Sequence, residues 1–597
     1  MASGSVKGLH LVVADVRETR EALAGRGVEV GEVEEHGRGV KFVHFRDPDG
    51  NSWALQEMPW RSREVSLYSP ARDLYRADTF PVALEGVAMR RVSAFAVLLI
   101  AVAVVAAGTV TGLAQGNPSR YQASLLPTVP GIAPLAAVVN VSALSRVVAE
   151  PRSGVALADH AVGQPAANAP GHNAIGTGSI TPKLAISVGT VLTNPLSSSD
   201  NPFGLTPPDM GLAVGSGDEV QMVNIVGRIW TGTTPGAVFD LRPFFGAPAN
   251  SLSDPWIIFD QPSGRFIAGI FDITLGGEDF AISKTSNPAG SWSVYHIKYP
   301  GVAGGGCPDQ GKGGVDDNVI ALAFNEFSTA GCSGGTFLGA VVEVFNKAQM
   351  LAGAAVSFVY TAPNAARVSL IPAQSMTSTT TEFFASLDNP SGTKLHRLTS
   401  TGVPPAAVTL TALADLTVGA YASPPAAPQA GTRKKVDSGD DRVQHVVWSS
   451  NTLVLAASDK CKPAGDTMSR ACARVIAVNT STGILSMNTD IASKGHYFYY
   501  PAPGINSAGQ VVVVFADSSS TTFPQVLVTA APIAGAFATP VLVQAGTKPN
   551  TTGRYGDYFA VAIDPASPTK AWVAGEVGGP LTGPFKWNTA VVQVTVI

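Results

Sequence analysis

Short runs of hydrophobic residues recur along the chain from about residue 186 to its end, and each follows a polar or proline-containing cluster. Their length and their richness in valine, isoleucine and phenylalanine are typical of buried β-strands. The runs lie roughly 45 to 70 residues apart, which leaves room for about four short strands in each repeat. Seven runs have this form: Val220–Asn224, Trp256–Asp260, Val319–Asn325, Phe383–Asp388, Val443–Trp448, Val511–Phe515 and Phe559–Asp564.

A period of this size, built from strands alone, predicts an all-β fold, a β-propeller of four-stranded blades over residues 186–597. The repeats favour seven blades, and six or eight blades are the alternatives. A β-sandwich is the alternative fold. Only 14% of the residues are charged, and the chain holds 62 glycines and 43 prolines, which suits short strands joined by turns. The net charge of −4 provides no basic surface, so the sequence predicts no nucleic-acid partner.

The first 60 residues have a different pattern. A strand over Leu9–Val13 is followed by helical spacing over Val16–Gly25 and by three strands, Val28–Val30, Val40–Phe45 and Ser52–Glu57. This order predicts a small α+β fragment with a βαβββ arrangement. Residues 61–88 show no clear periodicity and are interpreted as a linker.

Together with the turn "DPDGN" before the last strand, the βαβββ order resembles one module of the vicinal-oxygen-chelate (VOC) superfamily of glyoxalases, bleomycin-resistance proteins and dioxygenases. The resemblance covers residues 7–58, about half of such a domain. It implies metal ligands at positions that fall here on Gly8 and Ala54, while His10 and Glu57 do not replace them. We therefore expect a non-catalytic remnant without a metal, and a glyoxalase-type function is a remote alternative.

An export segment is predicted over residues 89–114. Met89 and two arginines precede the uncharged apolar stretch 94–107, and the small residues Gly112 and Ala114 come just before Gln115. This is the tripartite form of a secretory signal. Either Met89 is the true start and residues 1–88 come from an over-extended gene model, or residues 94–110 are an uncleaved anchor in the membrane. Both interpretations place the following chain outside the cell or on its surface. Residues 115–185, rich in proline, alanine, glycine and serine, are predicted to be a disordered spacer.

All four cysteines follow the export segment. An even number on the exported side fits two disulfides, Cys307–Cys332 and Cys461–Cys472. Free thiols are the alternative. Zinc ligation lacks a Cys-x-x-Cys spacing or a neighbouring histidine, so no metal ligands are assigned.

Charged residues stand at the start of the expected innermost strands. In a propeller these positions gather at one mouth of the central channel, where carboxylates with an arginine can bind a sugar acid or cleave a glycosidic bond. An acidic ring can also hold Ca²⁺, the one ion we regard as a candidate cofactor. The same residues can instead cap turns or tie blades together. The candidate ligand-binding residues are Asp209, Asp254, Asp309, Asp440, Arg442, Arg554 and Asp557.

Phrases such as "SDPWIIFD", "SGDDRVQHVVW" and "GRYGDYFAVAIDP", spread over about residues 204–576, resemble secreted bacterial β-propeller proteins without an assigned activity. The turn Asn287–Trp292 is distantly similar to the Asp-box of sialidase-type propellers, and we expect Trp292 to pack within a blade. The sequence contains no sialidase-type arginine motif and no other catalytic motif. The resulting hypothesis is a secreted or surface-tethered propeller that binds an extracellular glycan, protein or ion without catalysis. The alternative is a carbohydrate-active hydrolase or lyase that uses the clustered aspartates and arginines.

Overall fold

The computed structural model describes residues 9–12, 15–25, 28–36, 40–46, 52–57, 124–145, 171–175, 184–201, 205–301, 306–328, 335–388, 390–567, 569–579 and 587–597. The chain divides into two compact units, Met1–Ala114 and Gln115–Ile597. The expected linker 61–88 and export segment 89–114 lie outside the described residues. Within the described ranges, no helix combines the length and apolar character needed to cross a membrane.

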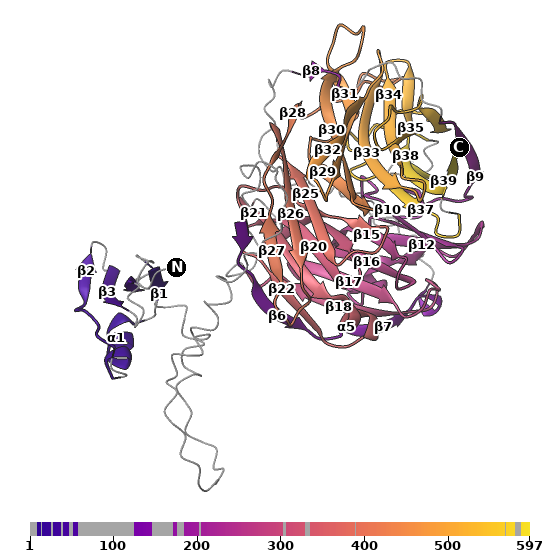
Figure 1. Ribbon diagram of the computed structural model, residues 1–597. Helices are drawn as coiled ribbons and strands as arrows, with labels where there is room; N and C mark the ends of the chain where they lie inside the picture. Colours follow the sequence, from indigo (N-terminus) through magenta and orange to yellow (C-terminus); the bar gives the residue numbers. More distant parts are fainter. Residues whose placement is uncertain are drawn as a thin grey trace. The chain divides into compact units, whose positions relative to one another are not determined.

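The first unit has the predicted βαβββ order (Figure 1). Strand β1 pairs in parallel with β4, and the sheet order is β1-β4-β3-β2. One strand differs from the prediction: Val30 makes only an isolated bridge to Phe45, and the second strand lies a few residues later. The elements are β1 (Leu9–Val12), α1 (Val16–Ala24), β2 (Glu34–His36), β3 (Val40–Arg46) and β4 (Ser52–Glu57).

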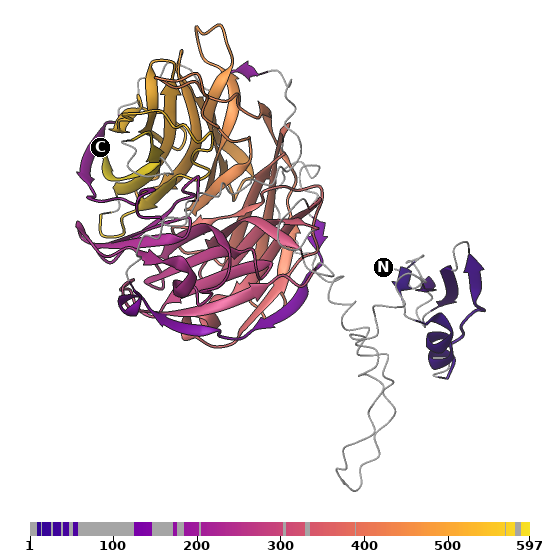
Figure 2. The same cartoon turned by 180° about the vertical axis from the view of Figure 1, so that it is seen from behind.

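The second unit is an all-β propeller with seven blades, as predicted (Figures 1 and 2). Blade 1 contains β10 (Gly211–Gly215), β11 (Asp218–Val223), β12 (Val226–Thr231), β13 (Thr234–Pro235) and β14 (Phe239–Asp240), and blade 2 contains β15 (Leu252–Asp260), β16 (Arg265–Asp272), β17 (Gly277–Ser283) and β18 (Ser291–Lys298). Blade 3 contains β19 (Cys307–Val315), β20 (Val319–Phe327), β21 (Phe337–Asn346) and β22 (Val356–Tyr360). Blade 4 contains β23 (Ile371–Pro372), β24 (Gln374–Ser375), β25 (Thr381–Leu387), β26 (Ser391–Thr401), β27 (Thr409–Ala412) and β28 (Leu416–Ala422).

The last three blades follow in chain order. Blade 5 contains β29 (Val443–Ser449), β30 (Thr452–Lys462), β31 (Arg470–Asn479) and β32 (Ile484–Ile491). Blade 6 contains β33 (Tyr497–Ile505), β34 (Gln510–Ser519), β35 (Thr522–Pro532) and β36 (Val541–Gln544). Blade 7 contains β37 (Ala560–Ile563), β38 (Lys570–Val577) and β39 (Asn588–Val596) and is completed by β9 (Ile186–Val191). Short helices α4 (Leu241–Phe244) and α5 (Lys347–Ala352) lie on blades 1 and 3.

The ring is closed in two ways. The innermost strands β10, β15, β19, β23, β29, β33 and β37 each lie beside the next, and β37 returns to β10. Strand β9, from before blade 1, is the outermost strand of blade 7, where Ile186 pairs with Val596 (Figure 2). Both ends of the propeller chain therefore share one sheet, which ties the first blade to the last.

Hydrophobic cores fill the spaces between neighbouring blades. Residues of each strand alternate between the two faces of a blade, so both faces contribute to a core. One hydrophobic cluster lies between each pair of neighbouring blades, which makes seven clusters around the ring. The cluster between blades 7 and 1 includes Trp230, Trp572 and Trp587. Trp292 packs in the core between blades 1 and 2, which confirms its predicted role.

Part of the predicted spacer is ordered, and that prediction is corrected here. Strands β5 (Ser124–Leu126), β6 (Val129–Ala133) and β7 (Ala137–Asn140) each add one strand to the outer edge of blades 4, 3 and 2, respectively. A short 3₁₀-helix (Val141–Ala143) follows, and β8 (His172–Asn173) pairs with β30 of blade 5. We call residues 124–144 the belt. It is ordered because it pairs with the outer strand edges of the blades, and apolar side chains such as Val139 and Leu126 pack, partly buried, against the cores.

The disulfide Cys461–Cys472 joins β30 and β31 of blade 5, as predicted. Cys307, at the start of β19, is also disulfide-bonded. Its expected partner, Cys332, lies outside the described residues.

Candidate functional site

One mouth of the propeller is built from residues with a left-handed backbone. In every blade such a residue stands at the innermost strand or just before it, and six of the seven are not glycine, although this conformation is costly for residues with a side chain. In blades 2, 3 and 6 a bulge in the innermost strand accompanies it. The seven residues and their φ angles are Asp209 (45°), Asp254 (54°), Gln310 (57°), Ser369 (44°), Gly439 (70°), Tyr500 (53°) and Asp557 (56°).

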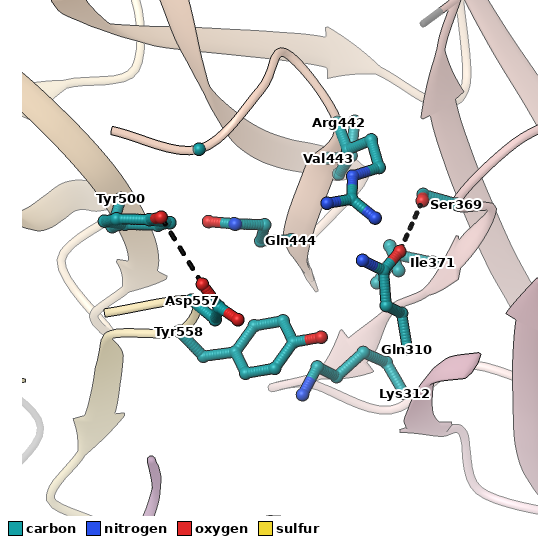
Figure 3. A pocket seen from close by; sticks show the side chains of 11 residues that line it. Gln310, Lys312, Ser369, Ile371, Arg442, Val443, Gln444, Tyr500, Asp557 and Tyr558 are labelled. Carbon is teal, nitrogen blue, oxygen red and sulfur yellow. Dashed lines mark hydrogen bonds between the residues drawn. The ribbon is translucent and has the colours of Figure 1, made fainter. Parts of the chain in front are cut away.

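A pocket of about 380 Å³, including its opening, lies at this mouth. Figure 3 shows Gln310, Arg442 and Gln444 directed into it, with Lys312 beside the ring of Tyr558. Its walls come from blades 3 to 7. A second cavity of about 610 Å³ follows the central channel and shares Lys312 and Gln444 with the first. A ligand that enters the mouth therefore meets polar side chains from several blades.

Asn224, at the end of β11, connects Asp209 and Asp254. Its amide nitrogen donates a hydrogen bond to Oδ2 of Asp209, and its oxygen accepts the backbone N–H of Asp254 at 3.0 Å. Asp209 is only 2% exposed, and its other oxygen, Oδ1, has no hydrogen-bond partner among the described residues. Blades 1 and 2 thus present two carboxylates side by side, one of them with an unused buried oxygen.

Lys312 and Tyr558 both interact with these carboxylates. The Lys312 ammonium is 3.2 Å from the centre of the Tyr558 ring, and the Tyr558 hydroxyl donates to Oδ2 of Asp254 at 3.3 Å. Both side chains are buried. Burial lowers the pKa of Lys312, while Asp254, Asp209, Glu278 and Asp557 act in the opposite direction. The ammonium is therefore held by surrounding negative charge.

Asp557 and Arg554 form the part of the mouth contributed by blade 7. The Arg554 guanidinium donates to Oδ2 of Asp557, and the Tyr500 hydroxyl donates to Oδ1 at 3.4 Å (Figure 3). Glu576 positions this loop, because its carboxylate accepts the backbone N–H of Gly556 at 2.7 Å.

The long connection between β28 and β29 brings Asp440 and Arg442 to the same mouth. Nε of Arg442 lies 2.6 Å from Oδ2 of Asp440. Gln429, earlier in this connection, donates to the backbone oxygen of Asn550 and accepts its N–H, both at 2.7 Å. Blade 5 and the loop before β37 are thus joined beside the pocket.

Several carboxyl groups at the mouth favour the neutral form. Burial raises the pKa of Asp209 well above its usual value, and the charges of Asp557 and Asp254 raise it further. Burial likewise raises the pKa of Glu278. The pKa of Tyr558 is raised by burial and then by Asp254, Asp209, Asp309 and Asp557. Burial and neighbouring negative charge thus favour the neutral form of Asp209 over its ionised form.

The structure brings all seven predicted residues to one mouth. Asp209, Asp254, Asp309, Arg554 and Asp557 surround Tyr558 or contact its neighbours, and Arg442 lines the pocket with Asp440 bound to it. Their assignment as ligand-binding residues remains a prediction.

The sequence did not identify the residues at the centre of this site, Lys312, Glu278 and Tyr558. Lys312 lies in the glycine-rich segment Gly311–Gly314 of β19, the innermost strand of blade 3. A side chain at Gly313 would place its Cβ 2.0 Å from the Trp256 ring, so glycine allows this close approach. The Trp256 indole in turn donates to Glu278 at 2.7 Å. A lone lysine among glycines is the available sequence signal.

A separate cluster in blade 5 has the composition of a metal site. Ligand atoms of His172, Asp459 and Asp490 lie within 4.8 Å of one another. However, the Arg474 guanidinium is 3.0 Å from Oδ2 of Asp459 and 3.4 Å from the His172 ring. Arg474 therefore supplies the positive charge that these carboxylates need, and a metal ion does not fit beside it.

The sequence matches no family model and no curated protein. The fold is similar to that of solved structures at low identity. A protein of unknown function from Dyadobacter fermentans is 10% identical over 65% of this chain and 94% of its own, with a TM-score of 0.32. A Trypanosoma rangeli sialidase in complex with the inhibitor DANA is 9% identical over 58% of this chain and 55% of its own (TM-score 0.29). An exo-β-1,3-galactanase from Clostridium thermocellum is 10% identical over 69% of this chain and 96% of its own (TM-score 0.27).

Proposed function

We propose that this protein is an exported β-propeller whose mouth binds an extracellular saccharide without cleaving it. The observation that carries this proposal is the mixture of hydrogen-bonding groups around one pocket. Asp557 is an acceptor, Lys312 and Arg442 are donors, and the amides of Gln310 and Gln444 both donate and accept. Each saccharide hydroxyl both donates and accepts, so it matches such a mixed set.

Other ligand classes fit less well. Carboxylates from three blades disfavour phosphate and nucleic acid. Calcium prefers six to eight oxygen ligands, and the carboxylates that would supply them already interact with the Lys312 ammonium. A neutral polyhydroxylated ligand requires no change in these charges.

Export is part of the same proposal. Disulfides persist in oxidising compartments, and the Cys461–Cys472 bond in blade 5 supports a location outside the cytoplasm. Mass spectrometry of the protein from its native host should find a mature N-terminus at Gln115. Peptides from residues 1–88 in the mature protein would instead support the anchored form.

Binding can be tested with a glycan array, followed by calorimetric titration of the bound glycans. Asp557→Asn should weaken binding by roughly tenfold or more, because it removes a carboxyl acceptor that lines the pocket. Asp218→Asn is the matched control, since Asp218 follows β10 at the opposite end from Asp209. Equal affinity in wild type and Asp557→Asn would contradict the proposal, as would the absence of any bound glycan.

Glycoside cleavage is the second candidate. Its support is that burial raises the pKa of Asp209 and that the charges of Asp557 and Asp254 raise it further, since glycosidases pair two carboxyl groups as acid and nucleophile or base. Release of reducing sugar that Asp209→Asn and Asp557→Asn each abolish, with folding retained, would favour this candidate over binding alone.

A further inference from the structure

We infer that the saccharide recognised at this mouth contains a neutral N-acetylated hexosamine, and that Gln444 selects it by accepting a hydrogen bond from the acetamido N–H. The inference rests on the proposed function and names the ligand class of the same site. It comes from a buried amide oxygen in the pocket that accepts no hydrogen bond from the described residues, and from lining charges that already have partners.

Gln444 lies near the start of β29, the innermost strand of blade 5, and its side chain is directed into the pocket (Figure 3). The residue is only 9% exposed, and its Oε1 accepts no hydrogen bond within the part of the chain that the structure describes. Leaving a buried acceptor without a partner is costly. A ligand donor that reaches Oε1 removes this cost, so Gln444 favours a ligand that carries such a donor.

Donors come from other side chains of the same pocket. Lys312 of blade 3 and Arg442, which precedes β29, also line it, and ammonium and guanidinium groups donate but cannot accept. The pocket thus offers an acceptor on one side chain and donors on others. A trans secondary amide fits this arrangement, because its N–H and its C=O lie on neighbouring atoms and point in opposite directions. Its N–H would donate to Gln444, and its carbonyl oxygen would accept from Lys312 or Arg442.

The charges in the pocket favour a neutral group at this position over an amine or an acid. Each charged residue that lines the pocket interacts with a residue of opposite charge: Arg442 with Asp440, Asp557 with Arg554 and Lys312 with Asp254. A ligand with a charge of its own would enter this partly buried site without a partner, and burying an unpaired charge is costly. An acetamido group brings a donor and an acceptor without adding a charge.

The test uses two pairs of probes whose members differ only in carrying an acetamido group or a hydroxyl at carbon 2. The first pair is the β-1,4-linked N-acetylglucosamine trisaccharide and the corresponding glucose trisaccharide. The second pair is the methyl glycosides of N-acetylgalactosamine and galactose. Calorimetric titration of the purified protein should show that the acetylated member of at least one pair binds about tenfold more tightly, the size expected when a buried acceptor gains its hydrogen bond.

Variants at Gln444 connect the preference to its side chain. Gln444→Leu removes the acceptor and nearly keeps the shape, so the ratio of the two affinities within a pair should approach one. Gln444→Glu keeps an acceptor oxygen at this position and should retain the preference. Gln544→Leu, on the outermost strand of blade 6, is the matched control and should leave the ratio unchanged. Circular dichroism of each variant checks that the fold is retained.

The outcomes separate this inference from the proposed function. Equal affinity within both pairs, or a preference for the hydroxyl member, overturns the acetamido group while saccharide binding stands. Binding confined to array glycans that lack an N-acetyl group has the same meaning. A folded Gln444→Leu variant that keeps the wild-type preference overturns the role of Gln444. If no glycan binds at all, the proposed function fails and the inference fails with it.

Discussion

The Lys312 ammonium lies 3.2 Å from the centre of the Tyr558 ring, although these residues belong to blades 3 and 7, which are not neighbours in the ring. The contact spans the mouth, where the channel would otherwise separate the two blades. Removing the lysine would leave Asp209 and Asp254 without their buried cation.

Lys312→Met should therefore lower the free energy of unfolding by about 3 kcal/mol, as expected when one partner of a buried charge network is lost. Urea unfolding measures the change. Lys298→Met, at the exposed end of β18, is the control and should change stability by less than about 0.5 kcal/mol. A Lys312→Met variant as stable as wild type would show that the ammonium is not needed to offset these carboxylates.

Glu278 should behave as a neutral acid. Burial raises its pKa well above the usual value, and its carboxyl accepts the Trp256 indole at 2.7 Å. Glu278→Gln keeps the shape and the acceptor, so it should change stability by less than about 1 kcal/mol. Glu278→Ala leaves the indole N–H unpaired in a cavity and should cost about 2–4 kcal/mol. If Glu278→Gln and Glu278→Ala destabilised the protein equally in thermal unfolding, Glu278 would be ionised in the native protein.

The propeller should be most stable in mildly acidic solution. Burial raises the pKa of Glu219, Glu326 and Glu343 to about 8 each. In the unfolded chain these groups lose their protons near pH 4.3, so the stability they confer is complete below that pH and is lost as pH rises toward 8. The melting temperature should fall as the pH rises from about 4 to 8. In the double variant Glu326→Gln/Glu343→Gln, the melting temperature should depend less on pH. A melting temperature that rises from pH 5 to pH 8 would contradict this.

The belt offers a matched pair of neighbouring residues. Val139 on β7 pairs with Trp292 and packs against the core between blades 1 and 2, whereas Val138 is 51% exposed. Val139→Asp should lower the free energy of unfolding by about 2–3 kcal/mol, and Val138→Asp by less than about 0.5 kcal/mol. Hydrogen exchange should increase along β18 in the first variant alone. Similar exchange in both would mean that the belt does not protect this edge.

Hydrophobic periodicity predicted the propeller, because its long strands carry their burial pattern in the local sequence. Asp254 and Asp557 were found because Asp254 stands near the start of an innermost strand and Asp557 shortly before one. The belt was missed because β5, β6 and β7 are three to five residues long in a segment rich in proline and alanine. Such strands are specified by the edges they pair with. Lys312 was missed for a similar reason: its partners come from other blades, and no local pattern encodes them.

The most direct test of the central claim is a crystal structure of the protein with the saccharide that binds it most tightly. We predict ligand density in the pocket at the mouth, in contact with Lys312, Arg442 and Asp557. The mouth should keep its left-handed residues in place. Density on the outer edge of the blades or at the opposite mouth, with this pocket holding only water, would contradict the account.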